Sequence, residues 1–105
     1  MHWTIVYFSV DVQDAILAFP EGVQARYLTE RMETFGPDLG MPHTKSLGKG
    51  LFELRMKSKE GIGRAFFGLL KERRVMMLHA FVKKSQKTPA KEVKIARKRL
   101  KEATK

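Results

Sequence analysis

Residues 51–82 read LFELRMKSKEGIGRAFFGLLKERRVMMLHAFV, and this stretch decides the predicted fold. It contains three strand-like runs with a short polar turn after each of the first two: runs 51–56, 62–70 and 75–82, and turns 57–61 and 71–74. Two such turns in succession predict an antiparallel meander. In the first run, alternation places Phe52, Leu54 and Met56 on one face of the strand. Arg55 falls on the opposite face.

The residues before the meander predict one more strand and two helices. An aromatic and β-branched run at 3–8 predicts the strand. Asp11 is a good N-cap for a helix over 12–19, and a second, amphipathic helix follows over 21–35. Its apolar positions recur at helical spacing: Ala25, Leu28, Met32 and Phe35. Glycines and prolines leave no room for a regular element in residues 36–50, which we expect to form a loop.

The residues after the meander predict a third helix. Thr88 caps it and Pro89 takes its first position, which is an efficient start signal. Its apolar positions again recur at helical spacing: Val93, Ala96, Leu100 and Ala103. The predicted order is β-α-α-β-β-β-α over residues 1–105, a single α+β domain. We expect a small, twisted, mainly antiparallel sheet that the first strand joins, with the N-terminal helices packed on one face.

The charge of the chain is strongly positive and unevenly distributed. The 105 residues include 21 Lys and Arg against 11 Asp and Glu, which gives a net charge of +10. Residues 1–40 carry two basic and six acidic side chains, whereas residues 41–105 carry 19 basic and five acidic ones. The second part of the chain therefore favours a polyanionic partner, such as nucleic acid or an acidic protein.

Composition and motif spacing exclude several classes of site. There is no cysteine, so a disulfide framework, a zinc–thiolate site and a cysteine nucleophile are excluded. The three histidines are scattered, and we expect neither a metal nor another cofactor. Gly48-Lys49-Gly50 precedes a strand rather than a helix and is not a phosphate-binding loop. The N-terminus lacks a basic leader and a long apolar run, so we expect a cytoplasmic protein.

Basic side chains on or beside the meander strands are the remaining candidates for chemistry: Arg55, Arg64, His79, Lys83 and Lys84. Adjacent strands bring such positions within reach of one another, so a cationic patch over aromatic residues is available. The same residues are also compatible with purely structural or solvated roles. Arg55 and Arg64 suit solvated strand faces, and the two lysines suit a solvated loop. His79 continues the alternation of Val75 and Met77, which suits a partly buried structural role. The cationic last helix suits a solvated face, a partner-binding face or an RNA-phosphate contact.

Several motifs resemble RelE/HigB-type toxins of the phage-derived, host-killer group. The resemblance begins with GPDLGMP at 36–42 and KSLGKGLFELR at 45–55, and continues with GRAFF at 63–67. It is most specific at 79–89, where HAFVKKSQKTP is similar to the family pattern His-x-Phe-x-Lys-Lys-x-x-Lys-Thr-Pro. The final ARKR at 96–99 resembles the helix that closes those proteins. One departure is Phe67-Gly68, where relatives often carry a tyrosine in the aromatic pair.

This resemblance implies a RelE-like fold and the toxin of a type II toxin–antitoxin system. Such toxins cut messenger RNA, usually in the ribosomal decoding site, and are held inactive by an antitoxin that is commonly a helix-turn-helix protein. The implied reaction needs no metal. The ribose 2′-OH attacks the adjacent phosphorus, which leaves a 2′,3′-cyclic phosphate and a 5′-OH. Two alternatives are a ParE-like toxin that poisons DNA gyrase without being a nuclease, and a basic nucleic-acid-binding module.

The candidate residues take specific roles if the chain is such a nuclease. Arg64 is expected to stabilise the transition state, with Arg55 as the second phosphate contact. Lys83 or Lys84 is expected to transfer the proton, because neighbouring cations favour the neutral form of a lysine, and His79 is the rival for this role. Further RNA contacts are expected from Lys45, Gln86, Lys87, Lys94, Lys98 and Lys101. A gyrase-binding relative would not need this convergence of cations.

Overall fold

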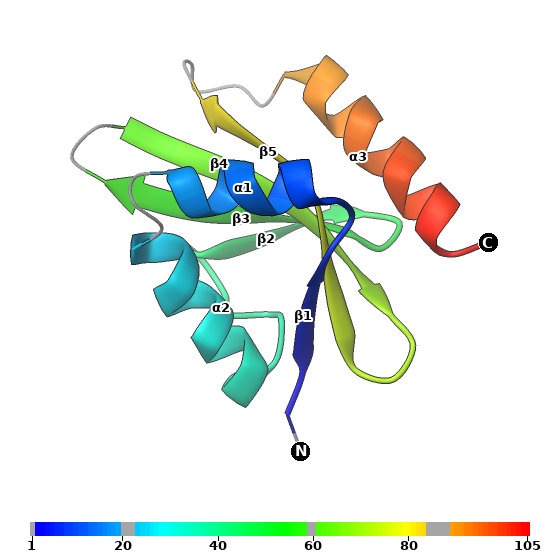
Figure 1. Cartoon of the computed structure of the whole chain (residues 1–105), viewed down its shortest axis with the longest axis horizontal. Coiled ribbons are helices and arrows are strands. Elements are labelled where there is room, and N and C mark those ends of the chain that lie inside the picture. The colour runs from blue at the N-terminus through cyan, green and yellow to red at the C-terminus, as the bar shows by residue number, and fades with distance from the viewer. Residues whose placement is uncertain (1, 20–22, 59–60, 84–88) are drawn as a thin grey trace.

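A computed structural model of the chain describes residues 2–19, 23–58, 61–83 and 89–105. Its helices and strands follow one another in this order (Figure 1): β1 Thr4–Tyr7, α1 Val10–Ala18, α2 Val23–Phe35, β2 Thr44–Gly48, β3 Leu51–Ser58, β4 Gly61–Leu70, β5 Arg74–Lys83 and α3 Ala90–Ala103. Within the described ranges, no helix is long and apolar enough to cross a membrane.

The five strands form one sheet in the order β1-β5-β4-β3-β2. Neighbouring strands from β2 to β5 pair antiparallel, so the predicted meander is confirmed. The first strand joins it, as expected, and pairs parallel to β5. The backbone N–H of Trp3 also donates to the carbonyl of Glu33 at 2.9 Å, which links the start of β1 to α2.

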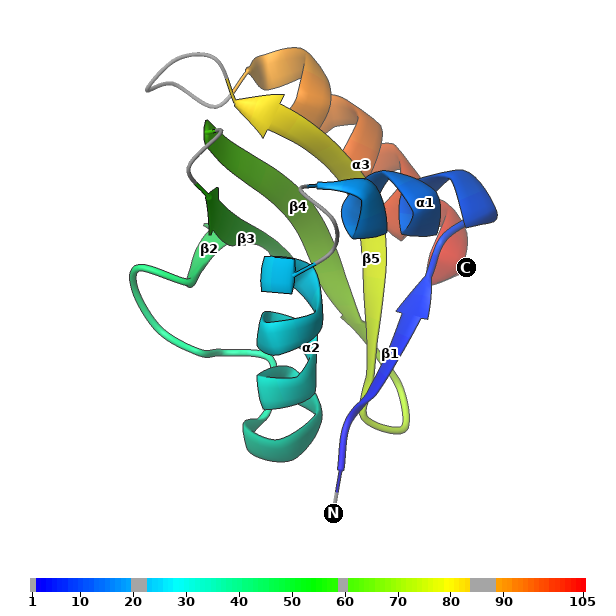
Figure 2. The ribbon, with the colours of Figure 1, turned by 60° about the vertical axis from the view of Figure 1, so that its left-hand side comes forward.

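Helices cover both faces of this sheet. On one face α1 and α2 bury a core with the strands: Val12, Ile16, Ala25, Leu28, Met32, Leu54, Met56, Ala65, Phe67, Val75 and Met77. On the other face α3 packs through Ala96 over Leu51, Phe66 and Leu78. Figure 2 shows α1 and α3 on opposite sides of β5. The α+β class and the shared face of the N-terminal helices are therefore confirmed.

The expectation of an irregular loop over residues 36–50 is wrong, because β2 lies within it. Thr44 pairs with Leu54 and Lys45 with Glu53, so β2 extends the sheet beyond β3. The glycines shape the turn into β3 instead of preventing a strand, since Gly48, Lys49 and Gly50 all have positive φ. Only Thr44 in β2 is buried, so this edge strand lacks the apolar alternation that would have revealed it.

Three details of the helices differ from the prediction. Ser9, and not Asp11, caps α1, because its hydroxyl accepts the Val12 N–H at 3.3 Å. Phe35 is 70 % exposed and does not belong to the apolar face of α2. Pro89 takes the N-cap position of α3, so the helix begins one residue later than expected. The proposed cap Thr88 lies outside the described residues.

A β-bulge in β5 changes which face His79 occupies. Phe66 pairs with His79 and Phe67 pairs with Met77, so Leu78 has no partner across the ladder. The extra residue moves His79 out of the alternation with Met77. His79 therefore lies on the α3 side of the sheet, whereas Met77 lies in the core with α1 and α2. The predicted alternation through His79 is wrong for this reason.

Candidate functional site

The strand register brings the candidate residues together in rows on the face of the sheet that α3 partly covers. The first row runs from Lys45 through Glu53 and Phe66 to His79. The second row contains Arg55, Arg64 and Phe81, and the backbone of Lys83 lies in the third, opposite Ile62. Directly opposed residues point to the same face, so the first two rows share one surface.

Arg64 is buried and paired with an acid that the sequence analysis did not identify. Arg64 is 2 % exposed and Glu53 4 % exposed. The guanidinium Nε forms an ion pair with Glu53 Oε1 at 3.1 Å, and neither Nε nor Nη1 has a hydrogen-bond partner among the described residues. Arg64 is therefore not a solvated surface residue. Glu53 was detectable as the acid that alternation places beside Arg55 on an otherwise basic strand face.

Arg55 is the more accessible of the two arginines. It lies directly opposite Arg64 in the neighbouring strand and is half-buried. Its backbone N–H donates to the carbonyl of His43 at 2.8 Å, and its side chain borders a shallow recess with His43 and Lys45. Burial lowers the pKa of Arg64, Glu53 raises it, and Arg55 lowers it further. The arrangement concentrates positive charge that a bound anion would offset.

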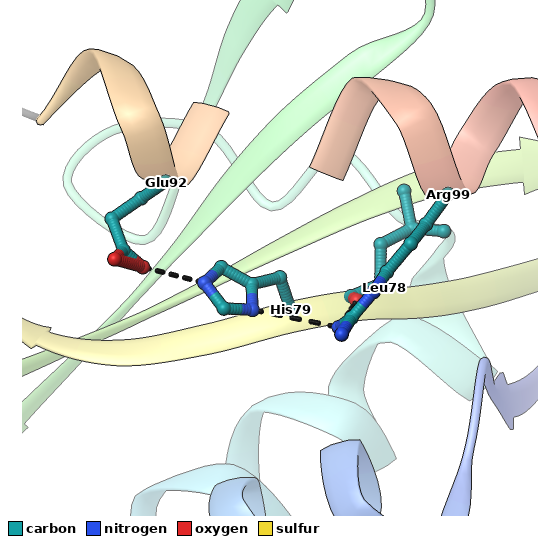
Figure 3. Close-up of polar contacts among 4 residues, drawn as sticks. All are labelled: Leu78, His79, Glu92 and Arg99. Carbon is teal, nitrogen blue, oxygen red and sulfur yellow. Dashed lines mark hydrogen bonds and ion pairs between the residues drawn. The ribbon is translucent and has the colours of Figure 1, made fainter. Parts of the chain in front are cut away.

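His79 connects β5 to α3 through both ring nitrogens (Figure 3). Nε2 lies 2.5 Å from Glu92 Oε2, and Nδ1 lies 3.5 Å from Arg99 Nη1. Arg99 also donates to the carbonyl of Leu78 at 2.7 Å. Arginine can only donate, so Nδ1 accepts and the neutral ring carries its proton on Nε2, which donates to Glu92. The geometry favours the structural role of His79 over that of a free base.

Aromatic rings line the surface beside the two arginines. The Phe66 and Phe81 centroids lie 5.3 Å apart, and His79 lies 6.1 Å from Phe81. Phe66 is fully buried, whereas Phe81 is partly exposed and opposite Arg64. The predicted combination of cations and aromatic residues on neighbouring strands is present. Phe81 is the ring on which a base could stack.

The remaining predicted RNA contacts fall into two groups. Lys45 on β2 is exposed, as are Lys94, Lys98 and Lys101 on α3. The arginines of α3 are used internally instead: Arg97 donates to the Leu47 carbonyl at 3.0 Å, and Arg99 binds Leu78 and His79. Three further candidates lie outside the described residues: Lys84, Gln86 and Lys87. Nothing is described of the Lys83 side chain.

Comparison with known families places this arrangement in context. The family model of phage-derived Gp49-like proteins (DUF891) matches residues 14–101. The match spans every candidate residue and all elements except β1, the beginning of α1 and the last two residues of α3. No curated protein matches the sequence.

Proposed function

Because this chain belongs to the phage-derived Gp49-like family, which is associated with toxins of toxin–antitoxin systems, we propose that it is a RelE/HigB-type toxin and an mRNA endoribonuclease. Its partner is a cognate antitoxin of the helix-turn-helix kind, and its substrate is messenger RNA on the ribosome in the cytoplasm. The net charge of +10 suits an enzyme that works among ribosomal phosphates.

The observation that carries the nuclease proposal is the buried Nη1 donor of Arg64. A buried donor without a partner costs about 1–3 kcal/mol, and native structures retain few of them. A phosphate oxygen is the kind of acceptor that would satisfy it, because guanidinium groups match phosphate geometry. Arg55 lies directly across the ladder and supplies a second, more accessible guanidinium.

The proposed reaction is metal-independent cleavage. The 2′-oxygen loses its proton, forms a bond to the adjacent phosphorus and closes a 2′,3′-cyclic phosphate. The bond from phosphorus to the 5′-oxygen breaks, and that oxygen takes up a proton to leave as a 5′-OH. Arg64 and Arg55 stabilise the charge that accumulates on the phosphorane oxygens. We assign the proton transfer to Lys83 or Lys84, because both nitrogens of His79 are engaged.

The test is cleavage of RNA by the purified chain in a translating extract, with the new 5′ ends mapped. We expect discrete 5′-OH ends, and Arg55→Ala should lower the cleavage rate about a hundredfold. Arg55 is the better position for an alanine because Arg64→Ala would also break the buried ion pair with Glu53. Arg64→Lys is the matched variant, since it keeps the charge but removes the second donor of the fork.

Two results would contradict the nuclease proposal. The first is a chain that arrests growth without producing RNA ends, accompanied by gyrase-dependent DNA breaks, which supports the ParE-like alternative. The second is an undiminished cleavage rate in the double variant Arg55→Ala with Arg64→Lys, which would show that the two arginines do not take part in the reaction.

A further inference from the structure

A groove lies at the end of the sheet that is remote from the arginine pair. It has a volume of about 530 Å³ and lies between the β4–β5 hairpin and the C-terminal end of α3, two segments on the same side of the molecule in Figure 1. Apolar side chains, three cations and one threonine line it: Leu69, Leu70, Met76, Ala103, Lys71, Arg74, Lys105 and Thr104. Leu69 is 38 % exposed, so part of this apolar lining is accessible to a partner.

One cation of this groove, Arg74, is held in place across a tight turn. Arg74 Nε donates to the carbonyl of Lys71 at 3.0 Å, across the turn that joins β4 to β5. Glu72 and Arg73 both adopt positive φ, 63° and 55°, so the turn is of the tightly wound kind. Glu72 is exposed and does not line the groove. The groove therefore combines an apolar floor with a basic rim in which Arg74 is held in place.

We propose that this groove binds an acidic, amphipathic segment of a partner protein. An apolar floor takes up the apolar side of such a segment, and Lys71 and Arg74 pair with its carboxylates. A single-stranded RNA is the poorer fit, because the groove offers no aromatic ring on which a base could stack. The identity of the partner as the antitoxin rests on the proposed function.

The groove is too far from the arginine pair for a segment bound in it to cover both sites. Six residues of extended strand separate Arg64 from Leu70 along β4, a distance of about 20 Å. A segment seated in the groove therefore anchors the partner without itself covering Arg55 or Arg64. Groove binding and RNA cleavage are then separable by mutation.

The binding test uses a defined probe. We would titrate the isotope-labelled full chain with a synthetic peptide of about five helical turns, with Leu on one side and Glu on the other, and follow amide shifts by NMR. We expect shifts at Leu69, Met76 and Ala103. The same peptide with Lys in place of Glu should bind more weakly, by a factor of at least about ten.

Two substitutions at one position separate charge from apolar contact. Leu69→Glu and Leu69→Lys both remove the aliphatic side chain, but only the first repels an acidic segment. Leu69→Glu should weaken peptide binding at least about tenfold relative to Leu69→Lys. Lys71→Glu, at an exposed position, should weaken it in the same direction. Thermal unfolding checks that each variant folds, and RNA cleavage by all three should equal that of the parent.

Three outcomes overturn the inference, and a fourth overturns only the proposed function. Shifts confined to the outer face of α2 or to the lysines of α3 place the acidic segment elsewhere. A uridine oligonucleotide that shifts the groove residues and displaces the peptide makes the groove an RNA site. Self-association that Leu69→Glu abolishes makes it a contact between two copies. A parent chain that binds the peptide but does not cleave RNA contradicts the proposed function, while the inference that the groove binds an acidic segment still holds.

Discussion

Glu53 determines how two arginines can occupy opposite positions on neighbouring strands. Like charges directly across a ladder are destabilising, and Arg55 and Arg64 are such a pair. Glu53 lies diagonally across the ladder from Arg64 and offsets its charge at 3.1 Å. Arg64 and Glu53 are both almost fully buried, so the loss of one partner breaks an ion pair in a desolvated site.

This burial predicts a stability effect that is independent of any activity. Arg64→Ala should lower the free energy of unfolding by about 3–5 kcal/mol, because Glu53 loses its counter-ion. The double variant Arg64→Met with Glu53→Met should lose much less, since no buried charge remains. Denaturant unfolding of the two variants and the parent measures both values. A double variant as unstable as Arg64→Ala would show that the ion pair is not the cause.

The arginine pair was predictable from the sequence, whereas the ion pair of Arg64 with Glu53 was not. Turn positions fix the register of β3 against β4, and the register alone places Arg55 opposite Arg64. The contact with Glu53 depends on which side-chain conformers fill the buried space, and that information is not contained in residue spacing. The involvement of Glu92 with His79 was hidden for a different reason, since it requires the packing of α3 on the sheet.

At the scale of the elements, the close packing of α3 on the sheet depends on a glycine in β4, Gly68. A Cβ at Gly68 would lie 2.5 Å from Leu100 Cδ1, so the glycine allows α3 to approach the backbone of β4. Polar contacts then fix the helix along its length, from Glu92 at its start to Arg97 and Arg99 further along.

This close approach predicts a compensating pair of substitutions. Gly68→Ala should destabilise the protein by about 1–3 kcal/mol, because Leu100 must leave its preferred position. Leu100→Ala alone should also be destabilising, since it removes apolar packing. In the double variant the methyl group added at position 68 occupies the space that Leu100 vacates. The double variant should therefore lose less stability than the sum of the losses in the two single variants. Strict additivity in thermal or denaturant unfolding would contradict the steric explanation.

The elements that the sequence predicted are those with a local cause. Alternation and turn residues specify the three long strands, and helical spacing specifies the apolar side of α3. Strand β2 has no such signal, because Lys45 and Ser46 are both exposed and the strand lacks apolar alternation. The bulge at Leu78 inserts a single residue, and no residue type marks it in the sequence. That one residue decides the face on which His79 lies.

At the scale of the whole molecule, the exposed lysines of α3 extend the positive surface beyond the arginine pair. Lys94, Lys98 and Lys101 follow one another at helical spacing on the side of α3 that does not pack on the sheet. Contacts of such lysines with phosphates release bound counter-ions, and the affinity then depends on the salt concentration.

These lysines predict a change in the salt dependence of ribosome binding. Replacing all three by alanine should weaken binding and reduce the slope of log affinity against log salt by about two, as expected for the loss of three phosphate contacts. The fold should be unaffected, because the side chains are solvated. Arg26→Ala, at an exposed position on α2, is the control and should leave the slope unchanged. An unaltered slope in the triple variant would show that α3 is not part of the RNA-binding surface.

The placement of helices on both sides of the sheet gives the molecule an electric dipole. The layer on one side includes α1, whose only charged residues are Asp11 and Asp14, and α2, where arginines and glutamates balance. The layer on the other side is α3, with six cations and two acids. A polyanion exerts a torque on such a body and turns the α3 side toward itself before contact. That side carries Arg55, Arg64 and Phe81, so the same torque that speeds the encounter also delivers the candidate site facing the RNA.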